Sequence, residues 1–182
     1  MSLKAQILGV KRKNEAQLIA TQVVDGRHSI EELMSLFFSD DWVICQKTSW
    51  PITMIADKDP DILLPYIPRM IDQLSRANHD AVIRNTIRTW QVMTIPEEYE
   101  GPIYDQCFEY FADPSYAVAI RVFAMTVCTN IAMRHPSLAQ EIMPIIEDNW
   151  DHSTAAWRSR GCLLYTSPSP RDQRGSRMPS SA

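Results

Sequence analysis

The chain has 182 residues, of which 45% are hydrophobic and 22% are charged, with a formal net charge of −4. This composition is typical of one soluble globular domain and excludes an intrinsically disordered chain. The N-terminal apolar run Ile7 to Val10 is short and is followed by three basic residues, so we expect neither a signal peptide nor a membrane span, and a cytoplasmic location.

The order of apolar and capping residues predicts helices throughout. Leu64, Ile67, Ile71 and Leu74 follow helical spacing, and no segment shows the alternation of a strand. Helix starts are marked by Ser29 with Glu32 and by prolines after Asp59 and His135. In chain order we expect an all-α protein with helices over 12–24, 29–38, 41–57, 60–76, 80–93, 101–112, 116–134 and 137–150, and another that starts at 154.

An internal repeat organises these helices into pairs. The dipeptides Ile83-Arg84, Ile120-Arg121 and Trp157-Arg158 recur at intervals of 37 residues. A shift of two periods superposes prolines and apolar residues together, for example Pro60 on Pro136 and Pro68 on Pro144. Weak similarity at a period of this length is the signature of a solenoid, in which each unit is one helical hairpin.

The segment Pro60-Asp-Ile-Leu-Leu-Pro-Tyr-Ile-Pro-Arg-Met-Ile-Asp-Gln-Leu74 resembles the second helix of a HEAT repeat, and residues 80–88 and 116–124 resemble first helices. The resemblance covers about residues 12–161 and fits small bacterial HEAT-like proteins. It implies an armadillo-type, right-handed α-solenoid of about four hairpins plus a truncated fifth, over a domain at residues 1–161. It also implies a concave face, lined by second helices, that binds another protein without catalysis.

The last residues resemble something other than a protein. Cys162 to Asp172 is similar to the conceptual translation of a transposase-type sequencing adaptor, and Ser176 to Ala182 continues the likeness. We expect residues 162–182 to be an adaptor-derived, disordered tail, although a native Ser/Pro-rich tail has the same composition. We also expect the natural chain to continue past Gly161. The cut solenoid should then expose apolar residues of its last full helix, taken from Leu138, Ile142, Ile145, Ile146 and Trp150.

Four arginines are the candidate binding residues. Arg84, Arg121 and Arg158 occupy one repeat position, Arg88 lies one turn beyond Arg84, and together they could form an anion track for nucleic acid, as in DNA-alkylation-repair-like HEAT proteins. The structural alternative is that each arginine pairs with a carboxylate near a unit start, such as Asp80, Asp113 or Asp151. Residues 162–182 hold three arginines and one aspartate, so residues 1–161 have a net charge of −6. This balance weighs against nucleic acid as a general partner, although a local groove could still be basic.

The remaining polar residues predict no catalytic site. Four cysteines are scattered without a metal-binding spacing, no Gly-rich phosphate loop occurs, and the four histidines lie singly at expected helix ends. We therefore expect no enzyme activity, metal, cofactor or small-molecule substrate. An acidic group around Tyr99, formed by Glu97, Glu98, Glu100 and Asp105, is either a recognition patch or a solvated loop before the helix at 101.

Overall fold

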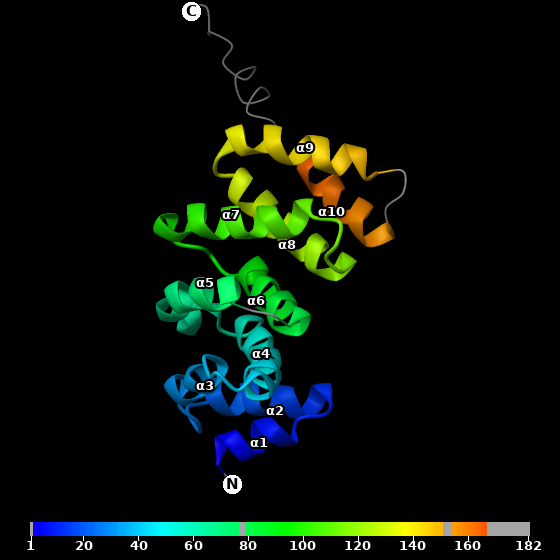
Figure 1. Ribbon diagram of the computed structural model, residues 1–182. Helices are drawn as coiled ribbons and strands as arrows, with labels where there is room; N and C mark the ends of the chain where they lie inside the picture. The colour runs from blue at the N-terminus through cyan, green and yellow to red at the C-terminus, as the bar shows by residue number, and fades with distance from the viewer. Residues whose placement is uncertain (1, 77–78, 151–153, 167–182) are drawn as a thin grey trace, which may run out of the picture.

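The structure is a computed structural model that describes residues 2–76, 79–150 and 154–166 (Figure 1). Helices account for all regular structure in these ranges, which confirms the predicted all-α class. The elements are α1 (Leu3–Gly9), α2 (Lys13–Val24), α3 (Ile30–Phe37), α4 (Trp42–Ala56), η1 (Pro60–Tyr66), α5 (Ile67–Arg76), α6 (Asp80–Val92), α7 (Glu97–Ala112), α8 (Val118–Ala132), η2 (Pro136–Leu138), α9 (Ala139–Asp148) and α10 (Ala155–Thr166).

The helices stack into two layers from the N-terminal to the C-terminal end (Figure 1). The first helices of the hairpins, α2, α4, α6, α8 and α10, each contact the next in chain order and form the first-helix layer. The second helices, α3, α5, α7 and α9, form the second-helix layer, and α3, α5 and α7 each pack against the first helix of the following hairpin. In the described residues this arrangement is the solenoid that the 37-residue period predicts, with four hairpins followed by α10 in the position of a further first helix.

Three of the expected helices differ in the structure. The one expected at 137–150 is the 3₁₀ segment η2 followed by α9, which ends at Asp148. The expected helix at 60–76 is a 3₁₀ segment, η1, followed by α5. Pro65 and Pro68 explain the break, because a proline has no N–H for the helical ladder and its ring clashes with the preceding turn. Helix α7 starts at Glu97, so Glu97, Glu98 and Glu100 form its first turn and not a loop. Carboxylates are favourable there because they face the positive end of the helix dipole.

Helix α1 was not predicted. Ser2 caps it by accepting a hydrogen bond from the N–H of Ala5, and Leu3 and Ile7 are buried. The Lys47 ammonium donates to the carbonyl oxygens of Leu8 and Val10, at 2.7 and 2.9 Å, and so ties the end of α1 to α4. α1 thus covers the N-terminal end of the stack.

Helix α10 covers the other end. Trp157 is 2% exposed and its ring stacks on that of Phe111, 5.4 Å between centroids. Ile142 and Ile146 are 0% exposed, while Leu138, Ile145 and Trp150 are half-buried. The expected apolar patch on the last full helix is therefore not formed as predicted, because α10 and α8 pack over it. Residues 162–166, which were expected to start a disordered tail, form the end of α10, and Cys162 is exposed. Residues 167–182 of the expected tail lie outside the described residues.

Candidate interaction surfaces

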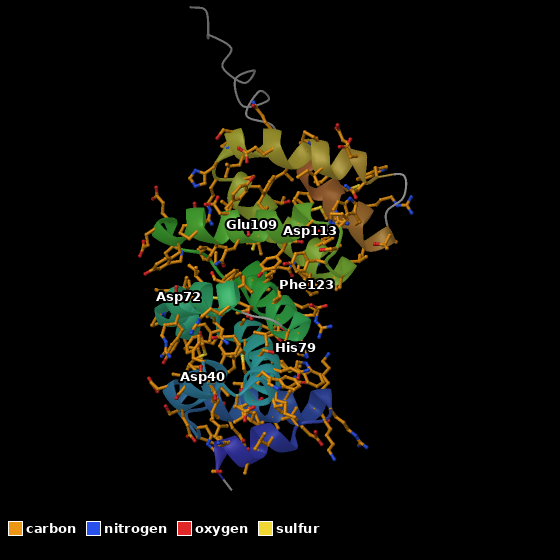
Figure 2. The ribbon with its side chains drawn as sticks, viewed as in Figure 1. Asp40, Asp72, His79, Glu109, Asp113 and Phe123 are labelled. Atoms are coloured by element: carbon orange, nitrogen blue, oxygen red, sulfur yellow. The ribbon has the colours of Figure 1, made fainter. Side chains whose placement is uncertain are left out.

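The four candidate arginines all lie on first helices, but they have different surroundings. Arg121 is 9% exposed. Its Nε donates to the Phe111 carbonyl at 3.1 Å, one Nη donates to the Asn149 side chain at 3.4 Å, and the guanidinium lies 4.6 Å from the Trp157 ring centroid. Burial lowers the pKa of Arg121, and the negative charge of Asp113 opposes this shift. Arg121 therefore joins the end of α7 to α9 and α10. Figure 2 labels Asp113, the residue that follows the end of α7.

The other three arginines are exposed. Arg88 forms an ion pair with Asp57 at 3.1 Å, a carboxylate of the preceding hairpin. Arg84 lies one turn before Arg88 on α6, and Arg158 lies on α10. The same repeat position thus holds a buried structural arginine in one unit and solvent-facing arginines in the two others. Asp151, one of the carboxylates suggested as a partner, lies outside the described residues.

Charge is divided between the two layers, which the sequence analysis missed. The second-helix layer, with η1, carries two basic residues, Arg69 and Arg76, against twelve acidic ones, of which only Glu100 is buried. The acidic residues are Glu31, Glu32, Asp61, Asp72, Glu97, Glu98, Glu100, Asp105, Glu109, Glu141, Glu147 and Asp148. Figure 2 labels two of them, Asp72 on α5 and Glu109 on α7.

The first-helix layer has the opposite balance. Its five helices carry two acidic residues, Glu15 and Asp80, against seven basic ones. The basic residues are Lys13, Lys47, Arg84, Arg88, Arg121, Arg158 and Arg160. The formal charge is therefore −10 on the second-helix layer and +5 on the first-helix layer, so the overall charge of the chain hides a strong polarity across the solenoid.

A hollow of about 490 Å³ lies in the second-helix layer between α7, the end of α8 and the start of α9. Four carboxylates line it, from Glu97, Glu100, Asp105 and Glu141, together with Tyr104 and Leu138. We call this hollow the acidic pocket. Its mixture of carboxylates and apolar side chains suits the long, partly apolar side chain of a lysine or arginine.

The inner wall of the acidic pocket is fixed by a buried carboxylate. Glu100 is 5% exposed, forms an ion pair with an Arg134 Nη at 2.6 Å and contacts His135 Nε2. Arg134 also donates to the Ile95 carbonyl, at 3.2 Å. Because Glu100 is compensated by these partners, the carboxylates of Glu97, Asp105 and Glu141 supply the exposed negative charge of the pocket.

Tyr104 forms the floor of the acidic pocket and is held by its hydroxyl. The hydroxyl donates to a Glu141 carboxylate oxygen at 3.5 Å, and the ring stacks against Phe108 with centroids 5.7 Å apart. Burial, with the neighbouring negative charges, raises the pKa of Tyr104. The Tyr104 hydroxyl therefore stays protonated at neutral pH and can donate to Glu141.

The histidines are placed at helix ends or in polar contacts. His79 caps α6, since its Nδ1 accepts a hydrogen bond from the Ala81 N–H at 3.1 Å, and its ring stacks on Trp42. His135 contacts Glu100, and His28 contacts Gln6. No cluster of three or more His, Cys, Asp or Glu suited to a metal ion occurs among the described residues. Within the same residues, every helix is too short or too polar to cross a membrane.

Together, the stacked hairpins and their two unlike faces define an all-α solenoid with an acidic face along its second helices. The model of the HEAT repeat domain matches residues 3–158, and the chain belongs to this family. The resemblance to HEAT repeats noted in the sequence is thereby confirmed. Neither a curated protein nor a solved structure matches the chain.

Proposed function

We propose that the chain is a non-catalytic scaffold that binds a basic segment of another protein along its second-helix layer. The observation that carries this proposal is the charge of that layer, twelve acidic residues against two basic ones. A HEAT solenoid offers an extended surface of successive second helices, and a line of carboxylates along it is complementary to lysines and arginines spaced along an extended peptide.

The acidic pocket is the best anchor point on this surface. A lysine or arginine side chain that enters it would place its charge among Glu97, Asp105 and Glu141 and its methylenes against Tyr104 and Leu138. Burying one cation beside fixed carboxylates contributes more to affinity than exposed pairs on the rim, whose charges are screened by water and salt.

The experiment is capture of partners from native lysate with the immobilised chain, compared across charge-neutralising variants. The triple variant Glu97→Gln, Asp105→Asn, Glu141→Gln empties the pocket of its exposed charge. The matched control Asp25→Asn, Asp40→Asn, Asp80→Asn removes the same charge from exposed sites outside the second-helix layer. We expect the pocket triple to lose a partner that the control retains, and a basic peptide from that partner to compete for binding. Equal retention by both variants would refute the acidic face as the binding surface.

The alternative of nucleic-acid binding through Arg84, Arg121 and Arg158 stays a prediction. It has less support from the geometry, since Arg121 is occupied by the Phe111 carbonyl, Asn149 and Trp157. A continuous track across three units would need that guanidinium to leave its buried position.

A further inference from the structure

The first-helix layer has a second surface feature, centred on a tryptophan. Trp50 on α4 is half-buried and lines two hollows. One hollow, of about 360 Å³, lies toward α2, and the other, of about 340 Å³, lies toward the end of α1 and the start of α6. Trp50 therefore packs against the hydrophobic core and also borders open space in two directions, so that part of the side chain is accessible.

Basic side chains flank the indole in both hollows. Lys13, Lys58 and Arg88 line the first hollow, and Lys47 and Arg84 line the second. Asp57 is the one carboxylate among the residues that line either hollow, and its charge is shared with Arg88. This neighbourhood of α2, α4 and α6 is the Trp50 site.

The cations of the Trp50 site differ in their availability. Lys47 donates to the carbonyl oxygens of Leu8 and Val10, and Lys58 donates to the Thr21 hydroxyl at 3.0 Å. Lys13 and Arg84 are exposed, and no hydrogen bond or ion pair joins their side chains to the described part of the chain. Lys13 lines the first hollow and Arg84 lines the second, and Trp50 lines both.

We propose that the Trp50 site binds a short single-stranded polynucleotide, with one base stacked on the indole and successive phosphates held by Lys13 and Arg84. An aromatic platform between two groups of cations matches the alternation of bases and phosphates along a single strand. A duplex hides its base faces, and a peptide of acidic residues alone, such as poly-glutamate, supplies anions but no ring for the indole. The acidic second-helix layer does not forbid this binding, because charges beyond about 8 Å are largely screened at physiological ionic strength.

This site is independent of the proposed protein-binding face, since it lies on the other layer and uses other residues. It also differs from the arginine ladder, because it gathers residues of three adjacent first helices around one ring and leaves Arg121 and Arg158 unused.

The test is fluorescence anisotropy of the full chain with a fluorescein-labelled twelve-nucleotide single strand of mixed sequence, titrated at several salt concentrations. The variant Lys13→Gln, Arg84→Gln removes both available cations. The matched control, Arg158→Gln, Arg160→Gln, removes the same charge from exposed residues of the same layer on α10. Trp50→Phe keeps a ring for stacking and Trp50→Leu removes it, with circular dichroism of each variant as the check of folding.

We expect the Lys13, Arg84 variant to bind at least about tenfold more weakly and to lose about 1.4 from the slope of log affinity against log salt, roughly 0.7 for each phosphate contact. The α10 control should change affinity less than about twofold. Trp50→Leu should weaken binding about fivefold or more, and the affinity of Trp50→Phe should lie between that of Trp50→Leu and that of the unsubstituted chain. Equal losses of affinity in the Lys13, Arg84 variant and in the α10 control would mean diffuse attraction only and would overturn the site. Tighter binding of a twelve-residue poly-glutamate peptide, or no binding of the strand at low salt, would also overturn it.

Discussion

Arg121 shows how one repeat position acquires different roles in different units. The Arg121 guanidinium lies over the ring of Trp157. One period earlier in the chain, Arg84 takes the place of Arg121 and Ile120 takes the place of Trp157, so Arg84 has no equivalent ring. An isoleucine side chain does not offset the cost of removing a guanidinium from water. A tryptophan ring, a helix-end carbonyl and a side-chain amide together do offset that cost. Equal spacing in sequence predicts equal backbone position but not equal surroundings.

Arg121→Met should therefore destabilise the fold. The substitution leaves the Phe111 carbonyl without its donor and removes a hydrogen bond from a charged group, which contributes about 1.5–3 kcal/mol. We expect the free energy of unfolding, measured by urea denaturation, to fall by about 2 kcal/mol. Arg84→Met, at the same repeat position but exposed, should change it by less than about 0.5 kcal/mol. Similar losses in both variants would contradict the structural role of Arg121.

Tyr110 predicts a loss of stability in alkaline solution. Burial raises the pKa of Tyr110 to about 12, and its hydroxyl donates to the Leu74 carbonyl at 3.4 Å. An unfolded tyrosine has a pKa of about 10. The folded state therefore holds this proton more tightly, and its contribution is complete below about pH 10 and is lost as the pH rises toward about 12. Urea denaturation between pH 9 and 11 should show that the free energy of unfolding falls less steeply with pH for Tyr110→Phe than for the unsubstituted chain. Identical falls in the two proteins would contradict the prediction.

At the scale of elements, the contact between α9 and α10 depends on a glycine. A Cβ on Gly161 would lie 2.9 Å from Ile146 Cγ2 and 3.0 Å from Trp150 Cζ3, closer than such atoms normally approach. Gly161→Ala should lower the free energy of unfolding by about 1 kcal/mol or more, because overpacking costs about 1–3 kcal/mol and alanine regains up to about 1 kcal/mol of helix propensity.

Gly9→Ala is the matched control for this prediction. Gly9 ends α1, and a Cβ there would have no atom within 4 Å. Thermal melting and urea denaturation should show Gly9→Ala unchanged or slightly stabilised. Were both variants equally stable, α10 would not depend on the close approach of Gly161 to α9.

The sequence predicts most of these elements because the period and the helical spacing are carried by many apolar residues at once. It fails where few residues carry the signal. Helix α1 has seven residues, too few for a periodic pattern, and owes its place to contacts with α4 that only the folded chain forms. The start of α7 was missed because its glutamates are typical of both a solvated loop and a helical first turn. The proline-rich segment before α5 was correctly placed as helical but not as 3₁₀.

At the scale of the whole molecule, the division of charge between the two layers could have been predicted from the sequence. The repeat assigns every helix to one of two layers, and counting charges by layer gives the polarity without coordinates. The pockets were not within reach, since the acidic pocket joins Glu97 to Glu141 and the Trp50 site joins Lys13 to Arg88. Such sites depend on which side chains of neighbouring helices come into contact, and a degenerate repeat pattern does not specify those contacts.

Shortened chains test whether residues 162–182 contribute to the stability of the fold. We propose, from the adaptor-like sequence, that residues 162–182 add nothing to the fold, so ending the chain at Gly161 should leave the melting temperature unchanged. Ending it at Thr154 also removes Trp157 from its place on Phe111 and should lower the melting temperature on the order of 5 °C. A loss of several degrees on removal of residues 162–182 alone would refute the proposal.

The hydrogen bonds that join neighbouring units also bear on how the chain folds during its synthesis. Ser49 with Asn85, Leu74 with Tyr110, and Gln91 with Asn130 are 36, 36 and 39 residues apart, close to one period each time. A ribosome that adds 5–20 residues per second delivers one period in about 2–7 s, far longer than a helix or a short loop needs to form. Each hairpin can therefore dock onto the finished one before it while the next is still being made, so the acidic face and the Trp50 site would assemble progressively from the N-terminal end.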